Sequence, residues 1–115
     1  MPAGTPLYVA DILQGAPQEW WGADYVVCSG VFHVKDQVEP GEWRRFINAM
    51  LRRMFELAKV GIGFNLMTSY VDYEAPHLCY LPPADMLDFC VRHLSRRVVI
   101  RHEYPLWEYT VYVYR

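Results

Sequence analysis

The sequence lacks the features of a secreted, membrane-bound or metal-binding protein. No apolar run approaches the ~20 residues that span a bilayer, and the N-terminus resembles neither a signal peptide nor a transit peptide. The cysteines Cys28, Cys79 and Cys90 are odd in number and lie far apart, which fits no disulfide framework or zinc motif. A net charge of −2 gives no general attraction to nucleic acid. We expect a cytoplasmic protein with reduced, buried thiols, no metal, and no membrane or nucleic-acid partner.

Apolar and aromatic residues are plentiful instead. The chain is 53% hydrophobic and 16% aromatic, which is too much for a disordered protein. At 115 residues it is long enough for one core, so we expect a single domain over residues 1–115. That length is small for a complete α/β enzyme.

The apolar spacing predicts two helices within a set of strands. From Pro40 to Ala58 apolar residues recur at i, i+3, i+4 and i+7, and a second helix begins near Pro82. Apolar and β-branched runs predict strands over residues 7–13, 24–34, 60–69, 96–104 and 107–115. The last two are joined too closely for a crossover and form an antiparallel hairpin. The earlier strands are expected to be parallel, with helices on the faces of the sheet.

Three segments resemble the class I S-adenosylmethionine-dependent methyltransferases. They are Asp24-Tyr-Val-Val-Cys-Ser-Gly-Val-Phe32, Phe64-Asn-Leu-Met-Thr-Ser-Tyr-Val-Asp-Tyr73 and Val99-Ile-Arg-His-Glu-Tyr-Pro-Leu106. The resemblance covers nearly the whole chain. It implies an α/β fold with a partial Rossmann-like sheet, equivalent to the C-terminal half of that fold (strands 3 to 7), and a small molecule as methyl acceptor. The Asp-Pro-Pro-Tyr element of the DNA amino-methylating branch is absent after residues 24–34, which argues against a nucleic-acid substrate.

The resemblance also implies a cofactor, S-adenosylmethionine, and a set of binding residues. The residues placed at the cofactor are Asp11, Ile12, Ser29, Gly30 and Val31, and those on the acceptor side are Asn65, Tyr70, Asp72 and Tyr73. Ordinary loop packing explains the two tyrosines equally well, and Asp72 also suits a turn. No catalytic residue is assigned. His33 could serve as a base, although strand alternation favours a ring that points into solvent or the helix layer.

The family's Gly-x-Gly-x-Gly turn has no counterpart ahead of residues 24–34. Such a turn lets the backbone approach the ligand closely, so one chain without it is not expected to bind the cofactor tightly. The chemistry would then belong to a fragment or one part of a split methyltransferase.

The missing first strands would leave the edge of strand 25–34 unpaired. Either residues 7–13 lie beside this edge, or the same strand of a second copy covers it in an isologous homodimer. A non-catalytic, dimeric remnant that serves binding or assembly is therefore the alternative function. A weaker alternative is an unrelated α/β protein that binds a ligand through the aromatic loop 70–80.

Overall fold

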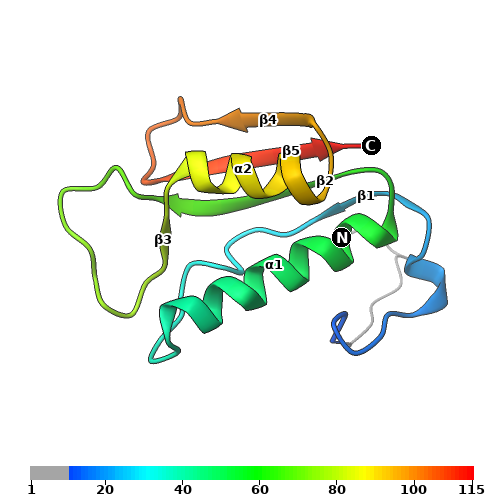
Figure 1. The fold of residues 1–115 in the computed structure, drawn as a ribbon, viewed down its shortest axis with the longest axis horizontal. Coiled ribbons are helices and arrows are strands. Elements are labelled where there is room, and N and C mark those ends of the chain that lie inside the picture. Colours follow the sequence, from blue (N-terminus) through cyan, green and yellow to red (C-terminus); the bar gives the residue numbers. More distant parts are fainter. Residues whose placement is uncertain (1–10) are drawn as a thin grey trace, which may run out of the picture.

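The computed structural model describes residues 11–115 (Figure 1). Its elements in chain order are η1 (Gln18–Trp20), β1 (Ala23–Val27), α1 (Pro40–Leu57), β2 (Ala58–Thr68), β3 (Tyr80–Leu81), α2 (Pro83–His93), β4 (Arg97–Arg101) and β5 (Glu108–Tyr114).

The strands form one mixed sheet in the order β1-β2-β5-β4. β1 and β2 are parallel, whereas β5 lies between β2 and β4 and runs antiparallel to both. The short β3 pairs with the last two residues of β2. This arrangement confirms the predicted α/β sheet, in which parallel strands are followed by a C-terminal antiparallel hairpin.

Helix α1 begins at a cap and ends directly in a strand. The Glu39 carboxylate accepts hydrogen bonds from the backbone N–H groups of Gly41 and Glu42, each at 2.9 Å, and Pro40 suits the first helical position. The helix ends at Leu57, and Ala58 is already the first residue of β2. Strand β2 therefore begins earlier than the sequence predicted. No helix of residues 11–115 is long and apolar enough to cross a membrane.

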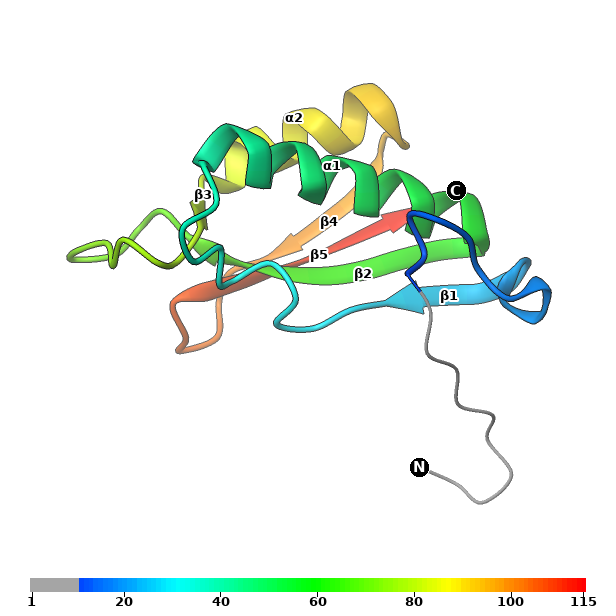
Figure 2. The same ribbon diagram turned by 90° about the horizontal axis from the view of Figure 1, so that it is seen from below.

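Both helices cover the same face of the sheet (Figure 2). The crossover connections β1–α1–β2 and β2–α2–β4 both move across the sheet in the same direction. Because such connections are right-handed, two that move in the same direction place their helices on the same face of the sheet. In β2, Ile62, Phe64 and Leu66 are buried on this covered face. The prediction of helices on the faces thus holds for one face. Within residues 11–115, no helix lies on the other face, which we call the open face.

Two predicted strands differ from the structure. Strand 24–34 ends at Val27, because the chain turns at Gly30, where φ is +73°. For strand 7–13, residues 7–10 lie outside the described residues. The described remainder is a turn, in which the Asp11 carboxylate accepts the N–H of Leu13 at 3.0 Å. Asp11 therefore stabilises a local turn, since aspartate side chains commonly accept the backbone N–H two residues later.

The three cysteines are free thiols. Cys79 and Cys90 are buried, while Cys28 is half-buried. Removal from water disfavours the thiolate, so burial raises the pKa of Cys28 to about 11 and that of Cys90 to about 12. These thiols are protonated near neutral pH and serve as packing groups rather than nucleophiles.

Candidate functional site

Asn65 of β2 connects this strand to the loop that follows the carboxyl end of β1. Its Oδ1 accepts the backbone N–H of Gly30 at 2.7 Å, and its Nδ2 donates to Ser29 Oγ at 3.2 Å. The left-handed φ of +73° at Gly30 lets the loop after β1 turn back towards this amide. Ligands of open α/β sheets bind outside the carboxyl ends of such strands.

A second pair of polar side chains extends this group. Glu108, the first residue of β5, accepts from Asn65 Nδ2 through Oε1 at 3.5 Å, and its Oε2 lies 2.9 Å from His33 Nε2. The side chains of His33 and Glu108 are only 19% and 24% exposed. His33 Nδ1 is buried without a hydrogen-bond partner. We call Ser29, Gly30, His33, Asn65 and Glu108 the polar cluster.

His33 therefore takes neither of the orientations that strand alternation favoured. β1 ends at Val27, so alternation no longer applies at residue 33, and the ring is held by Glu108 from the far end of the chain. Sequence reasoning missed Glu108 altogether. Its position depends on the register of β5 on β2, in which it lies opposite Met67, and no local motif marks that register.

A shallow hollow of about 280 Å³ opens at the polar cluster. Ser29 and Asn65 line it together with Val27, Gly63 and Tyr112 of the open face. A Cβ placed on Gly30 would meet no other atom within 4 Å, so the space above this residue is empty. Ser29 and Asn65 thus offer hydroxyl and amide groups at the edge of an accessible space, and Glu108 contacts Asn65 from behind them.

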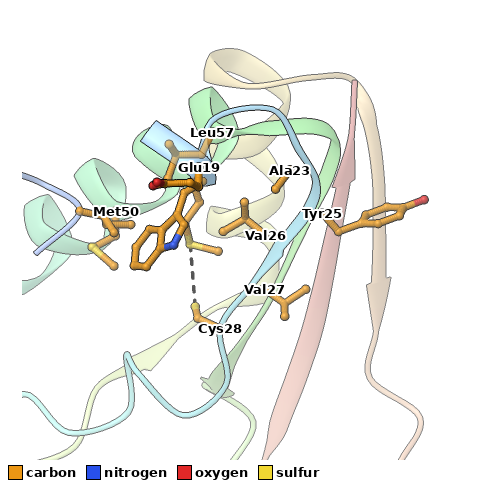
Figure 3. A pocket seen from close by; sticks show the side chains of 11 residues that line it. Glu19, Ala23, Tyr25, Val26, Val27, Cys28, Met50 and Leu57 are labelled. Carbon is orange, nitrogen blue, oxygen red and sulfur yellow. Dashed lines mark hydrogen bonds between the residues drawn. The ribbon is translucent and has the colours of Figure 1, made fainter. Parts of the chain in front are cut away.

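A larger, mainly apolar cavity of about 420 Å³ lies along the outer edge of β1 (Figure 3). In Figure 3 the side chain of Tyr25 points away from those of Val26 and Met50, although all three residues line the cavity. The Cys28 thiol lies 3.9 Å from Met54 Sδ here. Ile12 lines this cavity, whereas Asp11 lies in another hollow with Phe46.

Aromatic side chains form two further hollows beyond the carboxyl end of β2. The smaller, of about 220 Å³, is lined by Met67, Val71, Asp72, Tyr73, Ala75, Leu78, Tyr80 and Trp107. The larger, of about 400 Å³, is lined by Thr68, Tyr70, His102, Tyr104, Pro105, Leu106 and Trp107. Trp107 belongs to both, so it separates them.

The structure groups the predicted site residues into several places. Ser29, Gly30 and Asn65 are joined by hydrogen bonds, although one was assigned to the acceptor and two to the cofactor. Asp72 and Tyr73 share the smaller aromatic hollow, while Tyr70 lines the larger one. The side chain of Val31 is exposed. The binding roles of all these residues stay predictions.

No set of three or more His, Cys, Asp or Glu side chains within residues 11–115 is arranged to hold a metal ion.

Comparison with known proteins gives one clear sequence match. A Mycobacterium tuberculosis (strain H37Rv) protein, provisionally named methyltransferase Rv1506c, is 37% identical to this chain over 93 residues. The match covers 79% of this chain but 56% of the relative, so the chain spans little more than half of that protein's length. No protein-family model matches the chain.

Solved structures agree on the fold. Magnesium protoporphyrin IX methyltransferase of Synechocystis PCC 6803, with bound S-adenosylhomocysteine, has a TM-score of 0.61 at 14% identity. The match covers 92% of this chain and 49% of the Synechocystis protein. The pyocyanin biosynthetic protein PhzM has a TM-score of 0.57 at 12% identity, over 92% of this chain and 33% of its own.

Proposed function

We infer that this chain, which carries the C-terminal half of the class I S-adenosylmethionine-dependent methyltransferase fold, contributes one side of a methyl-transfer site. The observation that carries the proposal is the bridge from Asn65 to Ser29 and Gly30. This bridge connects β2 to the loop that follows the carboxyl end of β1, and β1 is an edge strand of the sheet within residues 11–115. Open α/β sheets bind their ligands outside the carboxyl ends of the parallel strands, and the loop after β1 leaves the sheet at that end.

The cofactor would supply a methyl group on a positively charged sulfur. The acceptor oxygen or nitrogen would take this methyl group and release its proton to solvent, and the sulfur would be left as a neutral thioether. The residues present fit one side of this cofactor. Gly30 leaves open space over the loop, and Ser29 and Asn65 offer hydrogen-bonding groups there. Glu108 acts as a positioning residue, because it holds both Asn65 and His33. In this proposal, the glycine-rich turn and the ribose-binding acid come from polypeptide outside these 115 residues.

A fusion protein tests the proposal. The segment of the M. tuberculosis relative that lies outside the match would be joined to this chain, and binding of S-adenosylhomocysteine would be measured by calorimetry. We expect the fusion to bind at least tenfold more tightly than this chain alone. Asn65→Ala should weaken binding by at least tenfold, because the loop after β1 loses its anchor.

Asn48→Ala is the matched control, since Asn48 lies on α1 and its amide oxygen accepts from Arg44, away from the polar cluster. A folded fusion that does not bind S-adenosylhomocysteine contradicts the proposal. If the Asn65 and Asn48 variants bind S-adenosylhomocysteine with equal affinity, the polar cluster is not part of the cofactor site.

The second candidate function is a non-catalytic homodimer used for binding or assembly. It is favoured by the free edge of β1, which has no partner strand within residues 11–115. On this strand Tyr25 and Val27 are 59% and 71% exposed, and unpaired apolar edges tend to associate. Light scattering after size-exclusion chromatography should then give twice the chain mass, and Val27→Lys should give the monomer. A monomer for the unmodified chain at micromolar concentration contradicts this candidate.

A further inference from the structure

Trp107 is a large exposed side chain in an unusual place. Its indole is 61% exposed although it directly precedes β5, and it forms a wall of both aromatic hollows. Leu106 beside it and Tyr70 across the larger hollow are exposed as well. Exposed aromatic and apolar groups gathered around a hollow mark a binding surface more often than a structural one.

The smaller hollow adjoins the polar cluster. Met67 lines this hollow, and in the sheet Met67 lies opposite Glu108. Glu108 in turn contacts both Asn65 and His33. A molecule in the smaller hollow would therefore lie next to the residues assigned to methyl transfer. The larger hollow is on the other side of Trp107.

The lining of the smaller hollow suits a flat aromatic molecule. It offers the rings of Tyr73, Tyr80 and Trp107 and the polarizable thioether of Met67, and both kinds of group interact favourably with π-systems. Tyr80 is held in place, because its hydroxyl accepts the N–H of Ala75 at 3.0 Å. Asp72 provides a carboxylate that can accept a hydrogen bond from a hydroxyl or amino group.

The size of the hollow limits the ligand. Its volume of about 220 Å³ is below the roughly 300–1,000 Å³ of sites that take drug-sized molecules. One ring or two fused rings are favoured over a larger ligand.

We propose that the smaller hollow binds the methyl acceptor, and that this acceptor is a planar aromatic of one or two rings that stacks on Trp107 and presents a hydroxyl or amino group to Asp72. The assignment rests on the proposed function, which it deepens by naming the class of acceptor. It also gives Asp72 and Tyr73 a role that Tyr70, in the larger hollow, does not share.

Binding of 2-naphthol to the full chain tests this assignment. Its saturated counterpart, decahydro-2-naphthol, has the same hydroxyl but no π-system and should bind at least tenfold more weakly. Trp107→Ala should weaken 2-naphthol binding by at least tenfold. Trp21→Ala is the matched control and should change nothing, because Trp21 is also exposed but lines neither hollow.

Two further measurements identify the hollow and the polar contact. In the unmodified chain, 2-naphthol should shift the methyl resonance of Met67 through its ring current. Asp72→Asn should weaken binding of 2-naphthol but leave naphthalene unaffected, since naphthalene has no hydroxyl to donate.

Equal binding of 2-naphthol and decahydro-2-naphthol, no binding of 2-naphthol, or an unshifted Met67 methyl would overturn the assignment. So would a larger loss from Tyr70→Ala than from Tyr73→Ala, which would place the ring in the other hollow. The cofactor experiment gives a separate result. If the fusion binds S-adenosylhomocysteine but the chain does not bind 2-naphthol, the proposed function stands and only the acceptor assignment is overturned. If the chain binds 2-naphthol but the fusion does not bind S-adenosylhomocysteine, the proposed function is overturned and the smaller hollow is left as an aromatic-binding site without a methyl-transfer role.

Discussion

The two faces of the sheet are built from alternate residues of the same strands but have opposite characters. On the covered face Tyr109, Val111 and Val113 of β5 are completely buried beneath the helices. On the open face Tyr112 and Tyr114 of that strand are only half-buried. The covered face carries apolar residues of β5, whereas Glu108 and Thr110 share the open face with the two tyrosines. Composition and the position of the helices therefore agree on which face of β5 is buried.

Glycine shapes the open face. A Cβ on Gly63 would lie 3.1 Å from the ring of Tyr112, and one on Gly61 would lie 2.6 Å from the carbonyl oxygen of Val113 and 3.2 Å from the ring of Tyr114. The tyrosine rings of β5 therefore lie over the glycines of β2. The open face thus exposes part of its tyrosine rings, whereas the aromatic and aliphatic side chains of the covered face are buried.

The largest expected effect lies on the covered face. Leu51 of α1 is completely buried in the core, so Leu51→Ala should lower the free energy of unfolding by about 2–5 kcal/mol through lost burial and a residual cavity. Urea denaturation followed by circular dichroism measures this loss. Leu87→Ala on α2 is the control, since Leu87 is 42% exposed. Similar losses in both variants would contradict the covered-face packing.

A smaller loss of stability is expected from Gly61, where β2 packs closely against the backbone of β5. Gly61→Ala brings a methyl group against the carbonyl of Val113 and should lower the free energy of unfolding by about 1–3 kcal/mol, the usual range for overpacking. Gly15→Ala provides a matched control, because its added methyl group meets nothing within 4 Å. An unchanged denaturation midpoint for Gly61→Ala would show that β2 and β5 lie further apart.

The open face itself should tolerate polar substitution. Val27 is 71% exposed, so Val27→Ser should change the free energy of unfolding by no more than about 0.5 kcal/mol, as is usual for surface sites. A loss above about 1 kcal/mol that grows with protein concentration would break the comparison, because it would mean that another chain covers this face in solution.

The cap of α1 should stabilise the fold in a pH-dependent way. Hydrogen bonds from the backbone of Gly41 and Glu42 lower the pKa of Glu39. This carboxylate therefore stabilises the fold above the ordinary glutamate pKa of about 4.3, and the contribution is lost as the pH falls through the lowered pKa. Thermal melts of Glu39→Ala should lie below those of the unmodified chain at pH 6 and converge with them near pH 3. A constant difference would contradict a charged cap.

Periodicity was sufficient to predict the elements with long, regular patterns. The apolar stripe of residues 40–58 and the β-branched run after Trp107 each identify one element, because each carries its own burial signal along the chain. The predicted cofactor position of Asp11 had no such support. Its carboxylate accepts from the N–H two residues later, and a short-range turn competes well with a strand in this setting.

The polar cluster could be predicted only in part. Ser29 and Asn65 came from the family resemblance, whereas the contact between His33 and Glu108 joins residues 75 positions apart. Such a contact requires the end of β1, the turn at Gly30 and the register of β5 to be known together. No local pattern contains that information.

The direct passage from Leu57 of α1 to Ala58 of β2 leaves the chain no slack at this point. Because side chains alternate along a strand, a single inserted residue here would reverse the facing of the whole of β2. Asn65 would then turn under the helices and Phe64 into water. We therefore expect natural length variation among homologous chains to avoid this junction and to accumulate between Thr68 and Tyr80, where the backbone leaves the sheet.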